Sequence, residues 1–382
     1  MKIPPFSFES ILDSRGVPTL NVVATVGDVK IEAKVPAGTS TGSHEAVALP
    51  IEQVLQQQFE LQQWLAGSDF TTLEEFDQAL IKKDGTDNKQ SLGGNTILGL
   101  SMMFARVAAE TEHQPLATWL AREYQKGQTQ LPTPIPKQPN PVPMMVMIEG
   151  GKHAQSGPFM QELLINGSLV DGTKVWHQLD TGDPLGMEGG FDVSFATKDE
   201  ADRGGLLKIQ EAISQTATAV TISVDAAANN IPEEYRYSVA SYVALAQEFA
   251  LQSIEDPFLE DDFDNWSRLC LELKGHRLDT KVIGDDLTVT NPARLEEALA
   301  KKALTGVIIK PNQIGTVTET LQFVRLAKEN QLTTIVSHRS GETDDTFIAD
   351  LAMAVEADSL KAGAPSKPER LVKYERLAIL HG

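Results

Sequence analysis

The stretch AVTISVDAA (residues 219–227) is an apolar run that leads into an acidic side chain, Asp225. The same pattern recurs toward the C-terminus, with leading polar residues spaced 30, 30, 25, 28 and 23 residues apart. The later runs are LQSIEDPF (251–258), KVIGDDLTV (281–289), TGVIIKPNQ (305–313), TTIVSHRSG (333–341) and DSLKAGAP (358–365). Each interval has the length of a strand, a helix and two loops. Continuous apolar strands that alternate with helices predict a parallel sheet.

Every one of these runs carries a charged or polar group at its end. The groups are three acids, a lysine, a cluster of three polar residues and a second lysine: Asp225, Glu255, Asp285, Lys310, His338 with Arg339 and Ser340, and Lys361. In a barrel of βα units the C-terminal ends of the strands meet at one mouth, where the active site lies. The sequence therefore predicts an α/β barrel with an enzyme site at its mouth.

The first part of the chain has a different pattern. Residues 18–35 alternate apolar and polar side chains around a Gly-Asp turn, which predicts an antiparallel hairpin. Helical patterns follow at 51–65, 71–83 and 95–110, so we expect an α+β domain over residues 1–127. The segment 128–143 holds six prolines, excludes helix or inner strand, and predicts a linker. The barrel domain is then expected over residues 144–382.

Composition limits the partners and the compartment. A net charge of −20 argues against nucleic acid and anionic membranes, which both need a basic surface. A small anionic substrate stays possible if cations gather in the site. The single cysteine, Cys270, excludes an internal disulfide and fits a packed thiol in a reducing compartment. The sequence shows neither a signal peptide nor a stretch of about 18 apolar residues, so we expect a cytoplasmic protein without a membrane span.

Three acids from consecutive strand ends predict a metal site. Asp225, Glu255 and Asp285 would repel one another unless a cation lay among them, and their hard oxygen atoms suit Mg²⁺ best. Any one of them alone could equally be a solvated loop acid. Lys310 could act as a base if nearby positive charge lowered its pKa, or could simply extend its ammonium group out of the sheet.

Long motifs along nearly the whole chain resemble the signatures of the enolase family. They are ILDSRGVPTL (11–20), VPAGTSTGSHEA (35–46), DGTDNKQSLGGNTILGLS (84–101), SIEDPFLEDD (253–262), IGDDLTVTNP (283–292), KPNQIGTVTET (310–320), SHRSGETDDTFIADL (337–351) and KAGAPSKPERLVKY (361–374). The resemblance implies an N-terminal α+β capping domain and a C-terminal barrel of ββαα(βα)6 order. Enolase-superfamily sites use a Lys or His base with one or two Mg²⁺ ions.

The resemblance also implies the metal ligands and the base. Asp225, Glu255 and Asp285 match the ligands of the tighter Mg²⁺, and Ser40 matches the serine that closes onto a second Mg²⁺ arriving with substrate. Lys310 matches the base that removes the proton from carbon 2 of 2-phosphoglycerate.

Acid and substrate-binding roles follow from the same motifs. Glu188, in GMEGG (186–190), matches the acid that helps the carbon-3 hydroxyl leave, and Glu162 matches the second carboxylate of that acid arm. His153 matches a loop histidine over the substrate, and His338 matches the histidine near the leaving hydroxyl. Lys361 matches the group that binds the substrate carboxylate. Arg339 and Ser340 match the groups that bind the substrate phosphate.

Several positions depart from the family pattern. The family's NGG is EGG here, which is expected to place Glu149 near the mouth, and its GDEGG is GMEGG, which puts Met187 in place of an acid. The chain is also shortened, in part within its loops. The family forms homodimers through Arg–Glu pairs, but the corresponding positions, Glu9, Asn21, Ile379 and Gly382, lack them.

Three functions are compatible with these observations. The first is a glycolytic, Mg²⁺-dependent hydro-lyase that interconverts 2-phosphoglycerate and phosphoenolpyruvate. The second is a paralogue that performs the same chemistry on a related phosphorylated or phosphonylated carboxylate, which Glu149 and the trimmed loops favour. The third is a non-catalytic binding protein, which the retained acids, base and phosphate contacts disfavour.

Overall fold

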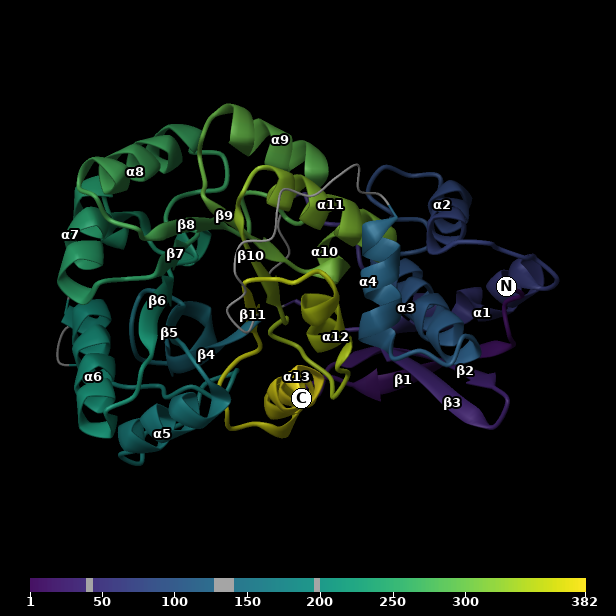
Figure 1. Ribbon diagram of the computed structural model, residues 1–382, viewed down its shortest axis with the longest axis horizontal. Helices are drawn as coiled ribbons and strands as arrows, with labels where there is room; N and C mark the ends of the chain where they lie inside the picture. Colours follow the sequence, from purple (N-terminus) through teal and green to yellow (C-terminus); the bar gives the residue numbers. More distant parts are fainter. Residues whose placement is uncertain (39–43, 127–140, 196–199) are drawn as a thin grey trace.

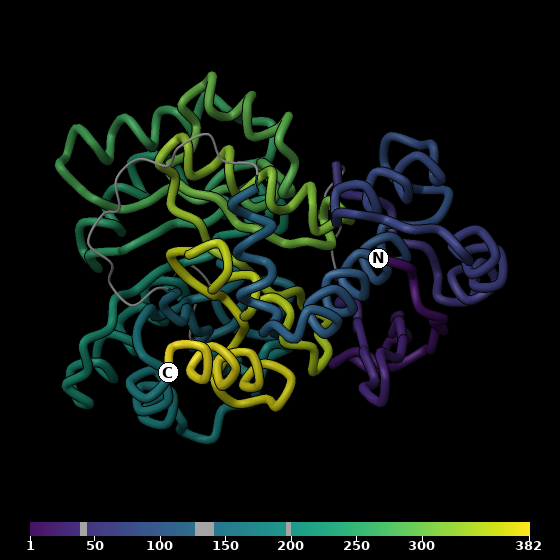
Figure 2. Tube along the Cα trace, turned by 45° about the vertical axis from the view of Figure 1, so that its right-hand side comes forward, coloured from purple at the N-terminus to yellow at the C-terminus, as the bar shows by residue number. Residues whose placement is uncertain are grey.

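A computed structural model describes residues 1–38, 44–126, 141–195 and 200–382. The N-terminal part, in purple and blue, lies beside a barrel in teal, green and yellow (Figure 1). The same two parts remain side by side in the turned view of Figure 2.

The N-terminal part is an antiparallel sheet followed by helices. The sheet has the order β1-β2-β3, with β1 at Phe6–Leu12, β2 at Pro18–Val26 and β3 at Val29–Lys34. The helices are α1 (Ile51–Leu65), α2 (Leu73–Asp84), α3 (Gly94–Thr111) and α4 (Leu116–Gln125). The hairpin turns at Gly27, whose φ of 58° suits glycine. The predicted hairpin and the three predicted helices are thus present, whereas β1 and α4 were not predicted.

Eight strands close the barrel in the order β10-β11-β4-β5-β6-β7-β8-β9. Their bounds are β4 Val142–Glu149, β5 Glu162–Asn166, β6 Thr221–Asp225, β7 Ser253–Glu255, β8 Lys281–Gly284, β9 Gly306–Ile309, β10 Thr333–Ser337 and β11 Ser359–Lys361. The helices are α5 Leu169–Leu179, α6 Ala201–Thr216, α7 Val239–Phe249, α8 Phe263–Gly275, α9 Pro292–Ala300, α10 Pro311–Ile314, α11 Val317–Glu329, α12 Phe347–Ala354 and α13 Pro368–His381. Strand β5 is antiparallel to both of its neighbours. The order β4, β5, α5, α6 and then six βα units confirms the ββαα(βα)6 barrel.

The linker prediction was wrong at its C-terminal end. Strand β4 begins at Val142, and Pro143 pairs with Leu360 of β11 inside the barrel. The carbonyl of Pro143 accepts a hydrogen bond from Gly167 N (3.1 Å), just past the last residue of β5. The missing N–H of Pro143 therefore falls where the neighbouring strand has ended. Linker residues up to 140 lie outside the described residues, and the other domain limits stay a prediction.

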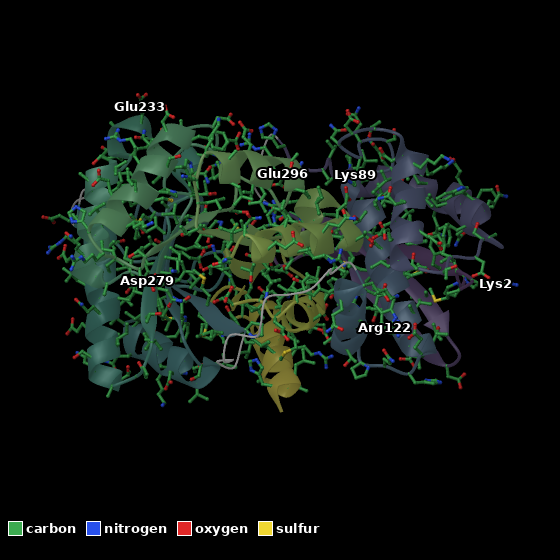
Figure 3. All side chains as sticks on the ribbon, turned by 45° about the horizontal axis from the view of Figure 1, so that its top comes forward. Lys2, Lys89, Arg122, Glu233, Asp279 and Glu296 are labelled. Carbon is green, nitrogen blue, oxygen red and sulfur yellow. The ribbon has the colours of Figure 1, made fainter. Side chains whose placement is uncertain are left out.

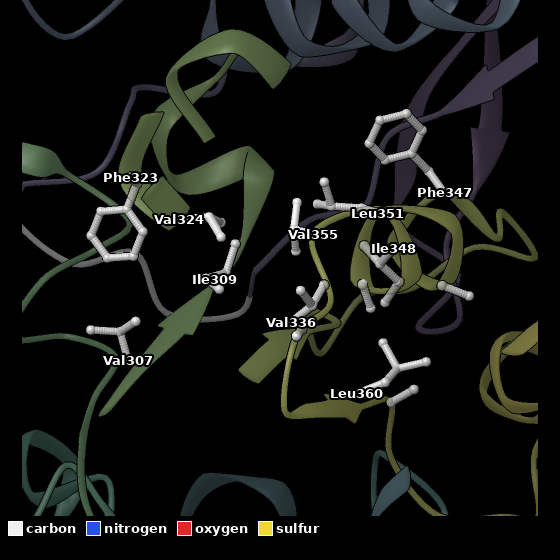
Figure 4. Packing of buried hydrophobic residues seen from close by; sticks show 14 of the residues in the cluster. Val307, Ile309, Phe323, Val324, Val336, Phe347, Ile348, Leu351, Val355 and Leu360 are labelled. Carbon is white, nitrogen blue, oxygen red and sulfur yellow. The ribbon is translucent and has the colours of Figure 1, made fainter. Parts of the chain in front are cut away.

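Barrel strands bury alternate residues on their two faces. Ile308 and Ile335 lie in the cluster inside the barrel, with Met144, Val146, Leu164, Ile283 and Ala364. Val307, Ile309 and Val336 instead pack outward against α11 and α12 (Figure 4). Because both faces are buried, the strands have the continuous apolar sequences seen in residues 305–309 and 333–336. Among the residues that the structure describes, none of the helices is long and apolar enough to cross a membrane.

The N-terminal part caps a barrel helix directly. The first amides of α11 donate to side chains of the other domain: Val317 N to Ser101 Oγ (3.0 Å) and Thr318 N to Asp77 Oδ2 (2.9 Å). Lys89, labelled near the boundary of the two parts in Figure 3, pairs with Glu319 at 3.0 Å. The first turn of a helix has unpaired N–H groups, so these contacts stabilise α11 and join the domains.

These contacts between the two domains should make the free energy of unfolding depend on pH, because Asp77 is one of the groups involved. Asp77 is buried, and burial raises its pKa from 3.8 to about 7. The folded state then binds a proton more tightly than the unfolded state, so stability falls as pH rises from about 4 to about 7. The substitution Asp77→Asn keeps a carbonyl oxygen for Thr318 N without a charge. Between about pH 5 and pH 8 we expect the variant to gain about 2–3 kcal/mol relative to the unmodified protein in urea unfolding. Parallel pH profiles for the two proteins would contradict this assignment.

Candidate active site

The predicted site residues gather at the C-terminal ends of the barrel strands. Asp225, Glu255 and Lys361 are the last residues of β6, β7 and β11. Asp285, Lys310 and His338 directly follow β8, β9 and β10. One pocket is lined by nearly all of the predicted residues: His153, Glu162, Glu188, Asp225, Asp285, Lys310, His338, Arg339, Ser340 and Lys361. Glu255 is fully buried next to Lys361, and Ser40 lies outside the described residues.

Lys361 lies among three buried carboxylates. Its Nζ is 2.8 Å from Glu162 Oε2, 2.9 Å from Asp225 Oδ2 and 2.8 Å from Glu255 Oε2. Burial opposes its charge, but the three carboxylates outweigh burial and raise the pKa of Lys361 well above its ordinary value. Lys361 therefore joins two of the predicted metal ligands to the acid Glu162.

The third predicted ligand, Asp285, lines the same pocket as Asp225 and also belongs to a second acidic group. Its carboxylate pairs with Lys310 and accepts from Gln313 Nε2 at 2.9 Å. Oxygen atoms of Asp256, Asp285 and Asp286 lie within 4.8 Å of one another. The carboxylate of Asp256 accepts the N–H groups of Asp285 (2.9 Å) and Asp286 (2.8 Å). Asp256 and Asp286 were missed in the sequence, although each directly follows a predicted ligand.

The donor set fits a divalent cation with hard-oxygen preference. Glu162, Asp225, Glu255 and Asp285 outnumber the two ammonium groups that pair with them, Lys310 and Lys361. Burial, followed by repulsion from Asp225, raises the pKa of Glu255 well above its ordinary value. Its Oε1 is buried without a hydrogen-bond partner among the described residues. An excess of buried carboxylate oxygen is the chemistry that Mg²⁺ requires.

The carboxylates around Lys310 raise its pKa. Burial, followed by the nearby cations Arg339 and Lys361, lowers it, but Asp285 and Glu255 together outweigh these effects. The expected lowering of the pKa depends on a metal ion bound beside Lys310, and it stays a prediction.

His153 lies between the two carboxylates of the acid arm. Its Nδ1 is 3.4 Å from Glu162 Oε1 and 3.7 Å from Glu188 Oε1. Burial opposes protonation, yet Glu188 and Glu162 outweigh it and raise the pKa of His153 to about 9. The same imidazole, with His338, keeps the pKa of Glu188 well below its usual value despite burial. At neutral pH the proton of this arm is therefore held by His153.

A buried arginine sets the tautomer of His338. Arg370, which is fully buried on α13, lies with Nη1 2.6 Å from His338 Nδ1. Since a guanidinium group only donates, Nδ1 must accept and the ring proton must be on Nε2. Nε2 is 3.0 Å from Glu188 Oε2, so His338 donates to the acid. Arg370 occurs in the motif 361–374 but was not singled out in the sequence.

Arg339 pairs with Glu45, another acid that was not predicted from the sequence. Its Nη1 and Nη2 contact Glu45 Oε2 (2.9 Å) and Oε1 (3.3 Å), and Nη1 also donates to Asn312 Oδ1 (3.1 Å). The carboxylate of Glu45 thus occupies the two guanidinium N–H groups of Arg339 that the resemblance assigns to the substrate phosphate. Glu45 and Ser340 both line the pocket.

Comparison with known families now identifies the chain's relatives. Residues 6–120 match the N-terminal domain of enolase, and residues 234–381 match its C-terminal TIM barrel domain. The chain belongs to the enolase superfamily. Enolase domains imply a lyase-type enzyme. The C-terminal matched range holds Glu255, Asp285, Lys310, Arg339 and Lys361.

The stretch between the matched ranges, residues 121–233, carries the acid arm of this enolase-superfamily chain. Two departures from the family pattern also lie here. Glu149, expected near the mouth, is the last residue of β4 and pairs with Glu162, which lines the pocket. It is itself fully buried beneath residues 186–190 and does not line the pocket. Met187, which replaces an acid, is half-buried beside Glu188.

The positions that replace the superfamily's dimer pairs make contacts within the chain. Asn21 Nδ2 donates to Glu9 Oε2 (3.2 Å) and to Glu32 Oε1 (3.0 Å). Asn21 is buried, whereas Ile379 on α13 is 70% exposed. Glu9 and the Nδ2 group of Asn21 therefore pair inside one subunit, whereas Asn21 Oδ1 is buried without a hydrogen-bond partner among the described residues. A homodimer stays a prediction.

Proposed function

We propose that the protein is a glycolytic, Mg²⁺-dependent hydro-lyase that interconverts 2-phosphoglycerate and phosphoenolpyruvate plus water. The supporting observation is one pocket lined by a lysine base, a protonated acid arm, and cations for a carboxylate and a phosphate: Lys310; His153 with Glu188; Lys361; and Arg339. A substrate that carries a carboxylate, a phosphate on carbon 2 and a leaving hydroxyl on carbon 3 fits this set.

Lys310 removes the proton from carbon 2 once its amine is neutral. This requires that the ion pair of Lys310 with Asp285, a proposed metal ligand, is weakened when a divalent cation is bound. That proton is weakly acidic because the neighbouring carboxylate is already an anion, and its loss leaves a dianion. The charge of Lys361, next to the substrate carboxylate, stabilises this dianion. A divalent cation held by Asp225, Glu255 and Asp285 supplies further positive charge there when it is bound.

The acid arm donates the proton that lets the carbon-3 hydroxyl leave as water. His153 holds this proton between Glu162 and Glu188, and Glu188 delivers it. The Nε2–H group of His338 donates a hydrogen bond to Glu188 and so orients that carboxylate. One proton is gained by Lys310 and one is lost by the acid arm, so the carbon–oxygen bond breaks without net proton uptake.

Arg339 and Ser340 bind the phosphate. The bidentate contact of Arg339 with Glu45 shows the fork geometry that suits an anion of this kind. Substrate binding then requires that phosphate replaces the Glu45 carboxylate at Arg339.

The alternative substrate is a related phosphorylated or phosphonylated carboxylate. Glu149 and Met187, which depart from the family pattern beside the acid arm, favour it. A non-catalytic role is disfavoured, because a binding protein gains nothing from a buried group of like charges.

Phosphoenolpyruvate formation from 2-phosphoglycerate tests the proposal. We expect ultraviolet absorbance to rise rapidly with Mg²⁺ and to stop with excess chelator. A folded protein that binds Mg²⁺ but does not turn over 2-phosphoglycerate would refute this substrate and favour the alternative. Turnover that persists in chelator would refute the metal requirement.

A further inference from the structure

We propose that Glu149 is a positioning residue for Glu188, because its buried carboxylate holds the backbone of residues 186–190 and so fixes the acid arm. The inference deepens the proposed function and rests on it for the role of Glu188. Residues 186–190 are called the acid loop below.

Glu149 binds the backbone of the acid loop at two points around Glu188. Its Oε1 accepts from Glu188 N (2.9 Å) and from Gly190 N (2.7 Å), and its Oε2 lies 3.0 Å from Glu188 N. Glu149 is the last residue of β4 and pairs in register with Glu162 of β5. The clamp is therefore built on rigid strands, next to the acid that it serves.

Glycines let the acid loop approach this carboxylate. A Cβ at Gly186 would lie 2.6 Å from Glu149 Cδ and Oε2, and a Cβ at Gly190 would lie 3.2 Å from Glu149 Cγ. A side chain at Gly186 would displace either the Glu149 carboxyl group or the loop, whereas a side chain at Gly190 would first meet Val146 Cγ1 at 2.8 Å. The GMEGG sequence and Glu149 are thus matched to each other.

The opposite side of the acid loop is held by the segment that follows β11 and by α5. Ser366 Oγ (2.9 Å) and Trp176 Nε1 (3.2 Å) donate to Gly189 O. Lys367 Nζ donates to Gly186 O (2.9 Å) and Met187 O (3.0 Å). The carbonyl groups of Gly186, Met187 and Gly189 are held on this side, and Glu149 accepts the N–H groups of Glu188 and Gly190 on the other. Met187 N donates to His153 O at 3.1 Å.

Because Glu149 and its neighbours hold the acid loop, they also fix the position of the Glu188 carboxylate. Its Oε2 contacts His338 at 3.0 Å, and its Oε1 lies 3.7 Å from His153. A displacement of about 1 Å in such a group lowers the rate of its step by about 100-fold. Proton removal by Lys310, which follows β9 on another part of the barrel, does not depend on the acid loop.

Two variants test the clamp. Glu149→Leu removes every acceptor at similar volume, whereas Glu149→Gln keeps one oxygen for Glu188 N and Gly190 N. The readout compares two steps on 2-phosphoglycerate in D₂O: deuterium exchange at carbon 2, followed by NMR, and elimination to phosphoenolpyruvate. Asp77→Asn is the matched control, a buried acid that also accepts a backbone N–H but lies at the domain boundary.

We expect Glu149→Leu to slow elimination about 100-fold while carbon-2 exchange changes less than about threefold. Glu149→Gln should recover most of this loss, and Asp77→Asn should leave the ratio of the two steps unchanged. Equal losses in both steps, or no loss in either, would overturn the inference.

A second measurement needs no substrate and separates this inference from the proposed function. Amide hydrogen exchange of Glu188 and Gly190 should accelerate at least about tenfold in Glu149→Leu and stay slow in Glu149→Gln. If the unmodified protein performs neither step on 2-phosphoglycerate, the proposed function fails and this exchange pattern still tests the clamp. Unchanged protection in Glu149→Leu would overturn the clamp itself.

Discussion

Replacing Lys310 by Ala should abolish turnover, with a fall in kcat of about 10⁴-fold. Lys310 lines the pocket and directly follows β9, and we assign it as the group that accepts the carbon-2 proton. The other lysine of the pocket, Lys361, is held by three carboxylates at the end of β11, and we assign its charge to the substrate carboxylate, so it should not take over as base. The measurement is the initial rate of phosphoenolpyruvate formation at saturating Mg²⁺ and substrate.

Lys281→Ala is the matched control for Lys310→Ala. Lys281 begins the neighbouring strand β8 and pairs with the exposed Asp279, at the opposite end of the strand from the site. This variant should keep nearly full activity. Circular dichroism must show that both variants fold, because loss of Lys310 leaves the Asp285 carboxylate without its ion pair. More than about a tenth of the activity left in Lys310→Ala would mean that another group is the base.

Replacing Arg370 by Met should give the largest loss of stability, about 3–5 kcal/mol in urea unfolding. Arg370 is fully buried and donates to Arg339 O (2.7 Å) and Ser340 O (2.6 Å), besides His338 Nδ1 (2.6 Å). Methionine fills much of the same volume but leaves these acceptors without donors, and burying an unpaired acceptor is costly. Activity should fall as well, because His338 loses the contact that sets its tautomer.

Arg376→Met on the same helix provides the control. Arg376 is 30% exposed and binds one group, the buried carboxylate of Asp350, so its loss should cost less than that of Arg370, about 1–2 kcal/mol. Similar losses in the two variants would show that the buried network around Arg370 has no special weight.

The extent of sequence-based prediction can be judged from particular elements. Residues 51–65 were predicted as a helix and form α1, because their apolar spacing suits one buried helix face. Strands β6 to β11 were found because they are buried on both faces and therefore mostly apolar, whereas β5 had not been predicted as a strand from its own residues. Strand β1 was missed, because FSFESIL pairs only with β2 and lacks a turn signal of its own. Val142 and Pro143 were misplaced, because proline composition alone does not show where a neighbouring strand ends.

Some site residues were likewise predicted from the sequence, whereas others were missed. Lys310, Asp285 and His338 were predicted to meet because each follows an apolar strand of a barrel, and they line one pocket. Arg370, Glu45 and Asp256 were missed, since an arginine in an amphipathic helix or an acid in a loop has no local mark of burial. Glu149 was noticed as a departure from the family, but its burial was not foreseen.

The amino-acid sequence by itself determined the barrel, the polar ends of its strands and the enolase kinship, because apolar periodicity and long motifs are local properties of a chain. Only the tertiary structure decided which charge meets which. Lys361 lies among three carboxylates, and Lys310 pairs with Asp285. Glu149 accepts backbone hydrogen bonds from the acid loop. These contacts join residues far apart in the chain, and their strength depends on burial and on distances below about 4 Å, which no local pattern of residues specifies.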